Sequence, residues 1–176
     1  MTRAFVLGAA LFLGSEAFAD DAQDAAANFY RNYLVLRQSE KMTGIPNEAQ
    51  LERLAPLITP ELSGLFRRAL REQRRCAKQF PGDKPPWIEG DIFSSHFEGF
   101  TSFKAGPGTA RNEATEVKVK FRYAEGASTV TWTDRLVLRN SAGQWRVGDV
   151  KYRGKFAFTS GFGTSLRKSL KRIPAC

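Results

Sequence analysis

The sequence predicts an α+β fold: N-terminal helices packed on a curled antiparallel sheet of about four strands, then a short C-terminal helix. Two observations predict it. Apolar residues recur with the period of an α-helix up to about residue 80, and they alternate with polar residues from about residue 97 onward. Short turns separate the alternating segments, which is typical of an antiparallel meander whose apolar face the helices must cover.

The first two helices are indicated by an apolar stripe and by a capping pattern. A long helix is expected from Asp21 to about Lys41, where apolar residues share one face. These residues are Ala26, Phe29, Tyr30 and Tyr33. Asn47 with Gln50 three residues later is typical of a capping box, so a short helix is expected from there through Leu54.

The third expected helix begins with Thr59 as N-cap and Pro60 at its first position, and it ends near Gln79. Its apolar face is expected to consist of Leu62, Phe66, Ala69, Gln73, Cys76 and Phe80. Its other faces carry the basic residues Arg67, Arg68, Arg71, Arg74, Arg75 and Lys78. Helical spacing therefore separates an apolar side from a strongly basic one.

Strands are expected in the second half of the chain. The first is expected at residues 97–104, and residues 105–108, Ala-Gly-Pro-Gly, would supply a turn. The others are expected at residues 117–123, 129–139 and 145–152. In the last strand the apolar residues change parity at Gly148, which predicts a β-bulge. A final helix is expected over about residues 165–173, with Leu166 and Leu170 on its apolar face.

The composition bounds the class of protein. The chain has 176 residues, with 27 Lys and Arg against 18 Asp and Glu, so its formal net charge is +9. This length and apolar content suit one globular domain. One His and two Cys cannot fill a four-ligand structural zinc site, and the sequence has neither a phosphate-binding glycine loop nor a serine-hydrolase motif. We therefore expect no metal and no cofactor.

Residues 1–19 are expected to be a signal peptide. A basic start precedes the apolar run Ala4–Gly14, and Ala17-Phe18-Ala19 supplies the small residues that a signal peptidase needs. The run is too short to cross a bilayer, which takes about 20 apolar residues, and no later segment is long enough. We expect cleavage after Ala19 and a single-domain periplasmic protein of residues 20–176.

Cys76 and Cys176 are expected to pair in that oxidising compartment. A bridge between them would close a loop of about 100 residues and hold the C-terminus, which the chain-entropy estimate values at about 3–5 kcal/mol. The alternative is two unpaired thiols, one in the third helix and one at the end of the chain. A catalytic cysteine is not expected, because no Cys-x-x-Cys motif occurs.

Three segments resemble the nuclear transport factor 2-like superfamily, also called cystatin-like or cone-shaped. They are residues 26–33 of the first helix, the loop Glu89–Ser95, and the last strand Trp145–Tyr152. The likeness covers nearly all of residues 21–173, and within the superfamily the chain is most similar to exported bacterial envelope proteins of unknown function. The resemblance implies a curled sheet wrapped around a long helix, with a conical pocket that some members use for catalysis and many for binding.

The lone His96 is a catalytic candidate, since a histidine beside a carboxylate can act as a general base near neutral pH. Its candidate partners are Asp91, Glu98, Asp134 and Asp149. The last two share the parity of apolar residues in their strands, which indicates an acid inside a pocket. The alternatives are a structural ion pair with Arg122, Arg135 or Arg146, or a side chain that the bulge at Gly148 turns outward. Alternatively, His96 and Glu98, which share one strand parity, both face solvent.

The basic residues are the strongest chemical signal. The candidate binding residues on the third helix are Arg67, Arg71, Arg74, Arg75 and Lys78, and further basic groups lie at Lys118, Lys120, Arg122, Arg167, Lys168, Lys171 and Arg172. Trp87, between prolines and an acidic residue, is the candidate exposed contact residue. A positive surface attracts anions, and export favours an anionic envelope component or an acidic protein over nucleic acid. The alternative is a solvated face that keeps the protein soluble.

These observations favour an exported, non-catalytic module of the envelope that binds a ligand or partner. One alternative is a small pocket enzyme, an isomerase, dehydratase or hydrolase, that uses His96 with a nearby carboxylate. Another is an immunity or inhibitor protein for an acidic partner. The enzyme requires His96 beside a carboxylate and a cavity, whereas both binding alternatives require an accessible basic surface.

The intact mass of the protein recovered from the periplasm of expressing cells tests the two expectations about processing. The mass should correspond to residues 20–176, and a thiol-alkylating reagent should add to it only after reduction, since both thiols would be in the bridge. A mass that retains residues 1–19 contradicts the cleavage. Two alkylated thiols before reduction contradict the disulfide.

Overall fold

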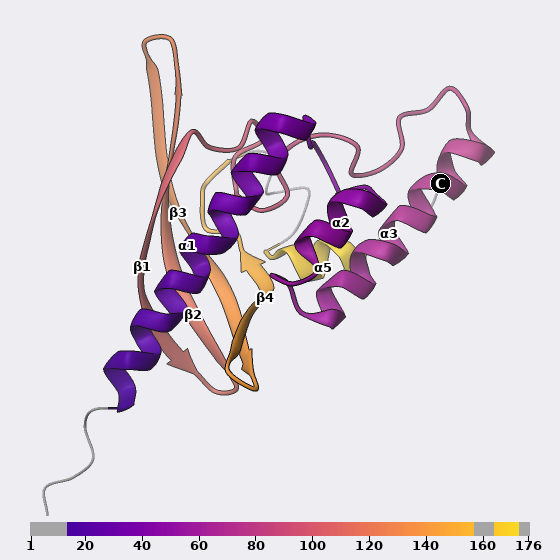
Figure 1. The fold of residues 1–176 in the computed structure, drawn as a ribbon. Helices are drawn as coiled ribbons and strands as arrows, with labels where there is room; N and C mark the ends of the chain where they lie inside the picture. The colour runs from indigo at the N-terminus through magenta and orange to yellow at the C-terminus, as the bar shows by residue number, and fades with distance from the viewer. Residues whose placement is uncertain (1–13, 157–163, 173–176) are drawn as a thin grey trace, which may run out of the picture.

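The computed structural model describes residues 14–156 and 164–172. Three helices precede a four-stranded antiparallel sheet of order β1-β2-β3-β4, and a short helix follows it (Figure 1). The elements are α1 (Gly14–Glu40), α2 (Glu48–Leu54), α3 (Pro60–Gln79), β1 (Ser102–Arg111), β2 (Ala114–Glu125), β3 (Ser128–Ser141), β4 (Gln144–Lys151) and α5 (Leu166–Lys171). The predicted α+β fold is confirmed.

Helix α1 lies across one face of the sheet, here called the inner face (Figure 1). The predicted apolar stripe is buried and is longer than expected: it comprises Ala22, Ala26, Phe29, Tyr30, Tyr33 and Leu36. A Cβ added at Gly108 of β1 would lie 2.9 Å from the Cβ of Ala22 and 3.2 Å from the carbonyl oxygen of Ala19. Glycine at this position therefore allows the helix to approach the strand closely.

The start of α1 differs from the prediction. The helix begins at Gly14 rather than Asp21, so the last residues of the predicted signal peptide form its first turns. Residues 1–13 lie outside the part of the chain that the structure describes. Alanines at positions 17 and 19 favour helix, which accounts for the extension. Among the described helices, none is long and apolar enough to cross a membrane.

The segment between α2 and α3 covers the outer edge of β4. Asn47 and Gln50 form the predicted capping box, and Thr59 caps α3 as expected. The backbone N–H of Thr59 donates to the carbonyl oxygen of Val147, and the N–H of Val147 donates to that of Leu57, each at 2.8 Å. The register of β4 against β3 skips Gly148, which confirms the predicted bulge. The last strand of the sheet therefore has no open edge at this point.

The first strand lies later in the chain than the sequence predicted. β1 begins at Ser102, and residues 105–108, expected to be a turn, lie inside it at a shift of register. Pro107 is tolerated there because β1 is an edge strand, where a missing N–H breaks no ladder bond. The chain turns instead at Asn112, whose φ of 54° is left-handed. Residues 91–101 are irregular rather than extended.

The second half of α3 extends beyond the rest of the fold (Figure 1). Phe80, predicted to be buried, is 39% exposed because the sheet and the other helices lie beside the first half of α3. Cys76 is buried, at 6% exposure, but Cys176 lies outside the described residues, so the disulfide stays a prediction. α5 begins after its cap Ser165 near the predicted position, and Leu166 and Leu170 are buried.

The face of the sheet opposite α1, here called the outer face, carries an ion triad that joins β2, β3 and β4. The carboxylate of Glu116 accepts hydrogen bonds from Arg135, at 3.0 Å, and from Lys151. The hydrogen bond from Lys151 lowers the pKa of Glu116 against the opposing effect of burial, and Arg135 lowers it further.

Glu116→Gln should lower the free energy of unfolding at neutral pH by about 1 kcal/mol or less, because Arg135 and Lys151 are 38% and 37% exposed and water screens the triad. A lowered pKa means that the unfolded chain binds the proton more readily than the folded one. The stabilisation is therefore present above the ordinary glutamate pKa of about 4.3 and is lost as the pH falls through the folded value.

Denaturant unfolding at a series of pH values measures this difference between wild type and Glu116→Gln. Glu113→Gln is the matched control, because Glu113 is 90% exposed and lies 3.6 Å from Arg139. The control should change stability at no pH. A difference for Glu116→Gln that grows in acid contradicts the interpretation.

Candidate functional site

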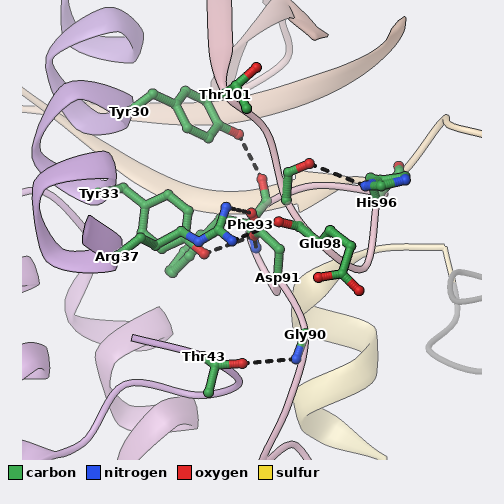
Figure 2. Close-up of polar contacts among 12 residues, drawn as sticks. Tyr30, Tyr33, Arg37, Thr43, Gly90, Asp91, Phe93, His96, Glu98 and Thr101 are labelled. Carbon is green, nitrogen blue, oxygen red and sulfur yellow. Dashed lines mark hydrogen bonds and ion pairs between the residues drawn. The ribbon is translucent and has the colours of Figure 1, made fainter. Parts of the chain in front are cut away.

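Residues 91–101 form an irregular loop between the helices and β1, and this loop contains His96 and Asp91. Two buried carboxylates, Asp91 and Asp134, hold it in place. Figure 2 shows the loop beside the C-terminal half of α1, with Tyr33 and Arg37 directed toward Asp91. The loop has little apolar periodicity of its own, and its path is fixed both by polar contacts and by the buried side chains of Ile92, Phe93 and Phe100.

Asp91 is 1% exposed and lies under α1. Its Oδ1 accepts hydrogen bonds from the Tyr33 hydroxyl at 2.8 Å and from the backbone N–H of Phe93 at 2.7 Å, and its Oδ2 lies 3.1 Å from Nη1 of Arg37. Burial raises the pKa of Asp91, although Arg37 and the hydrogen bond from Tyr33 oppose the rise. Burial, and then Asp91, raise the pKa of Tyr33 well above its ordinary value. The group therefore anchors the loop to α1.

Arg37 joins the same loop at a second point. Its Nη2 donates to the carbonyl oxygen of Glu98 at 2.7 Å while Nη1 contacts Asp91 (Figure 2). A Cβ at Gly99 would lie 1.7 Å from Nη1 of Arg37, and the φ of Gly99 is +76°. Only glycine fits here, because any side chain at position 99 would overlap the guanidinium group of Arg37.

Asp134 of β3 is fully buried, and N–H and O–H groups surround its carboxylate. The donors are the N–H and hydroxyl of Ser95, the indole N–H of Trp132 at 3.1 Å, and the N–H groups of Arg153 and Gly154 at 2.7 and 3.2 Å. The predicted pairing of Asp134 with an arginine is wrong among the described residues, where no cation lies within ion-pair distance of it. Hydrogen bonds stabilise the buried charge in place of a cation.

His96 does not meet the carboxylates proposed for it. Its Nδ1 lies 3.2 Å from the carbonyl oxygen of Gly99, and its ring packs against Tyr123, Trp132 and Phe156 at centroid distances of 5.0, 5.2 and 4.9 Å. Within residues 14–156 and 164–172, no carboxylate oxygen lies within 4.0 Å of its ring nitrogens. The structure therefore places His96 in an aromatic contact and assembles no acid–base pair around it.

Asp149 lies apart from this loop, at the end of β4 that meets α5. Its Oδ1 accepts hydrogen bonds from the backbone N–H groups of Val150 and Arg167, each at 2.9 Å. Burial raises its pKa, and the hydrogen bond from Arg167 opposes the rise. The bulge at Gly148 turns this side chain away from the face that Trp145 and Val147 share, and toward the first turn of α5. Asp149 therefore serves to hold α5 on the sheet.

An open hollow of about 430 Å³ lies between the end of α1 and the loop. It is lined by Leu34, Arg37, Gln38, Lys41, Met42, Glu98, Phe100, Thr101 and Tyr123. Glu98 is the one carboxylate considered for His96 that lines it, and His96, Asp91, Asp134 and Asp149 are not among the lining residues. Sequence reasoning missed Arg37, although a signal was present: Arg37 continues the helical spacing of Tyr30 and Tyr33, so it places a charge at the end of an apolar stripe.

The candidate binding residues on α3 have the exposure that was predicted. The basic residues Arg67, Arg68, Arg71, Arg74, Arg75 and Lys78 are all exposed. Arg74 contacts Glu48 at 3.0 Å and Arg75 contacts Glu72 at 2.8 Å. Arg68, Arg71 and Lys78 have no acidic partner among the residues that the structure describes. These three cations are therefore available to a partner.

The prediction that Trp87 is an exposed contact residue is wrong, because its side chain is only 7% exposed. The backbone N–H of Ile45 donates to its carbonyl oxygen at 2.9 Å. A Cβ at Gly44 would lie 2.0 Å from that same oxygen. The close approach of these two loops brings Trp87 into the core and leaves its neighbour Ile88 41% exposed.

Comparisons with known proteins identify no family and no function for this chain. No family model and no curated protein matches the chain. Among solved structures, the solution structure of a SEC-C motif containing protein from Rhodopseudomonas palustris is similar, with a TM-score of 0.39 and 12% identity. The match covers 78% of this chain and 92% of that one. A likeness of this size supports no conclusion about fold or function.

Asp134→Asn should lower the free energy of unfolding by at least about 3 kcal/mol, because the new amide group would face N–H donors that then lack an acceptor. Asp149→Asn is the matched control. Asp149 is only half-buried and accepts fewer backbone bonds, so its loss should be about 1 kcal/mol. Denaturant unfolding compares the two variants, and equal losses would contradict the central role given to Asp134.

Proposed function

We propose that this chain is an exported, non-catalytic binding module of the bacterial envelope. In this proposal the basic face of α3 binds an anionic envelope component. The proposal includes the expected signal peptide and a relationship to the nuclear transport factor 2-like superfamily. A long helix across one face of an antiparallel sheet is compatible with that relationship.

The observation that carries the proposal is the exposed arginine face of α3. Five of its six cations are arginines, and they lie opposite the residues that α3 buries. Arginine has a planar fork of donors that matches a carboxylate with two parallel hydrogen bonds, which lysine cannot form. This chemistry favours carboxylate-bearing partners such as the cell wall.

The geometry supports a binding role better than a catalytic one. His96 contacts aromatic rings and a carbonyl group, and the three aspartates that could activate it hold separate parts of the backbone. A general base must lie within hydrogen-bond reach of the group it activates or of the residue that orients it. The enzyme alternative therefore has no assembled site among the described residues.

An acidic protein would suit the same arginine face, so the inhibitor alternative needs an experiment that separates it. Lipid-free cell-wall sacculi carry carboxylates but no membrane, and protease treatment removes proteins bound to them. Retention that survives protease treatment supports a cell-wall ligand. Retention that protease abolishes identifies an acidic protein instead.

The full chain should cosediment with lipid-free sacculi at low ionic strength and be released near 1 M salt, where screening acts over about 3 Å. Arg68→Glu with Arg71→Glu should lower retention at least about tenfold, because two charge-assisted contacts are lost. Arg68→Lys with Arg71→Lys keeps the charge and removes the fork, so it should lower retention by a smaller factor.

Arg31→Glu with Lys155→Glu is the matched control, since both residues are exposed and lie off α3 while the change in net charge is the same. This control should bind as the wild type does. An equal loss in the control and in the α3 variant would show that total charge, rather than the arginine face, governs binding, and would contradict the proposal.

A further inference from the structure

The outer face of the sheet is a second basic surface, separate from α3. The described helix that packs across β1, β2 and β3 is α1, and it covers the inner face. The strand pairing places basic residues on the outer face: Lys104, Arg111, Lys118, Lys120, Arg122, Arg135, Arg139, Arg146 and Lys151. The acidic strand residues on the same face are Glu116 and Asp149, and Glu113 in the turn before β2 contacts Arg139 of this face. Positive charge therefore dominates this side of the sheet.

The register sets like charges directly opposite one another. Lys104 of β1 pairs with Lys120 of β2, and Lys118 of β2 pairs with Arg135 of β3. Like charges at directly opposed positions destabilise a sheet, whereas opposite charges stabilise it. The direct opposition of these cations does not stabilise the sheet, although Arg135 also contacts Glu116.

Four cations on β1 and β2 stay exposed without an acidic partner, and we call them the lysine-rich patch. Its members are Lys104, Lys118, Lys120 and Arg122. Glu116 contacts both Arg135 and Lys151, and Glu113 lies 3.6 Å from Arg139. Arg122 donates to the hydroxyl of Thr129 at 3.2 Å, and no ion pair with an acidic residue in the described chain involves the other three.

The surroundings of the patch are polar and shallow. The exposed neighbours on the same face are threonines, at positions 109, 129, 131 and 133. The large apolar side chains exposed in the described chain are Val35, Phe80, Ile88 and Phe97, and none lies on the sheet. The hollow found here measures about 130 Å³ and is lined by Thr109, Arg111, Glu116, Lys118 and Arg135.

These features match a planar array of anionic groups better than a single ligand. The hollow is too small for most organic ligands, whose pockets measure about 300–1,000 Å³. Among the described residues, no exposed aromatic ring lies on this face to stack a base, as single-stranded nucleic acid would need. Lysine is a compact, hydrated point charge, which suits diffuse attraction to many anions rather than paired recognition of one.

We propose that the lysine-rich patch docks the protein on an anionic phospholipid surface, by electrostatic attraction and without insertion. The inference goes beyond the proposed function, which assigns α3 to a lipid-free partner, and each can fail without the other. Cations near an anionic leaflet each strengthen binding by about fivefold, so three of them contribute about 100-fold.

The test measures cosedimentation of the mature protein, residues 20–176, with vesicles of phosphatidylglycerol and phosphatidylcholine in equal parts. The wild type should bind these vesicles at low salt and dissociate from them when the salt concentration is raised. It should not bind vesicles of pure phosphatidylcholine. Lys104→Gln with Lys118→Gln and Lys120→Gln should weaken binding about 100-fold. Arg68→Gln with Arg71→Gln and Lys78→Gln removes the same charge from α3 and should change it less than about threefold.

The sheet variant should fold, because it removes a repulsion between opposed lysines, and its unfolding midpoint checks this. Lys→Arg at the same three positions should keep binding. Failure of the wild type to bind the vesicles, equal loss in both Gln variants, or loss in the α3 variant alone overturns the inference. Retention on lipid-free sacculi is measured separately, so a protein that passes that test and fails this one leaves the proposed function standing.

Discussion

The rest of the structure depends on the buried carboxylate of Asp134. It accepts hydrogen bonds from Ser95 in the loop, from Trp132 in its own strand, and from the backbone just beyond β4. Three segments far apart in the sequence therefore end at one negative charge. An apolar residue at this position would leave several buried donors without an acceptor. The free-energy cost of those unpaired donors exceeds the desolvation cost that is avoided by removing the carboxylate. We therefore expect the loop and the last strand to unfold together.

Asp91 extends this anchoring to α1 and thereby shapes the hollow beside the loop. Arg37 contacts both Asp91 and the carbonyl group of Glu98, so the guanidinium group forms one wall of the hollow and is not free to swing toward a ligand. His96 is held by Gly99 on the other side of the same loop. Charged residues that suggest catalysis in the sequence thus act here as supports for an irregular segment.

Local signals in the sequence predicted most of the helices and strands, and tertiary contacts decided the rest. The caps at Asn47 and Thr59 and the bulge at Gly148 depend on neighbours in the chain, and all three are confirmed. The path of residues 91–101 depends on hydrogen bonds that Asp134 accepts and Arg37 donates only after folding, so no periodicity could reveal it. Trp87 was misjudged for the same reason: its burial results from the approach of the loop at Gly44.

The irregular first strand also bears on how copies of this protein behave together. β1 is the edge of the sheet that no other segment of the described chain pairs with, and an open edge can recruit a strand from a second molecule. Pro107 offers no N–H at that edge, and the shift of register around it interrupts the row of carbonyl and amide groups. Copies concentrated on one surface would thus meet an edge that cannot template a continuous ladder. Pro107 and the register shift are two features that hinder edge-to-edge pairing of exposed strands.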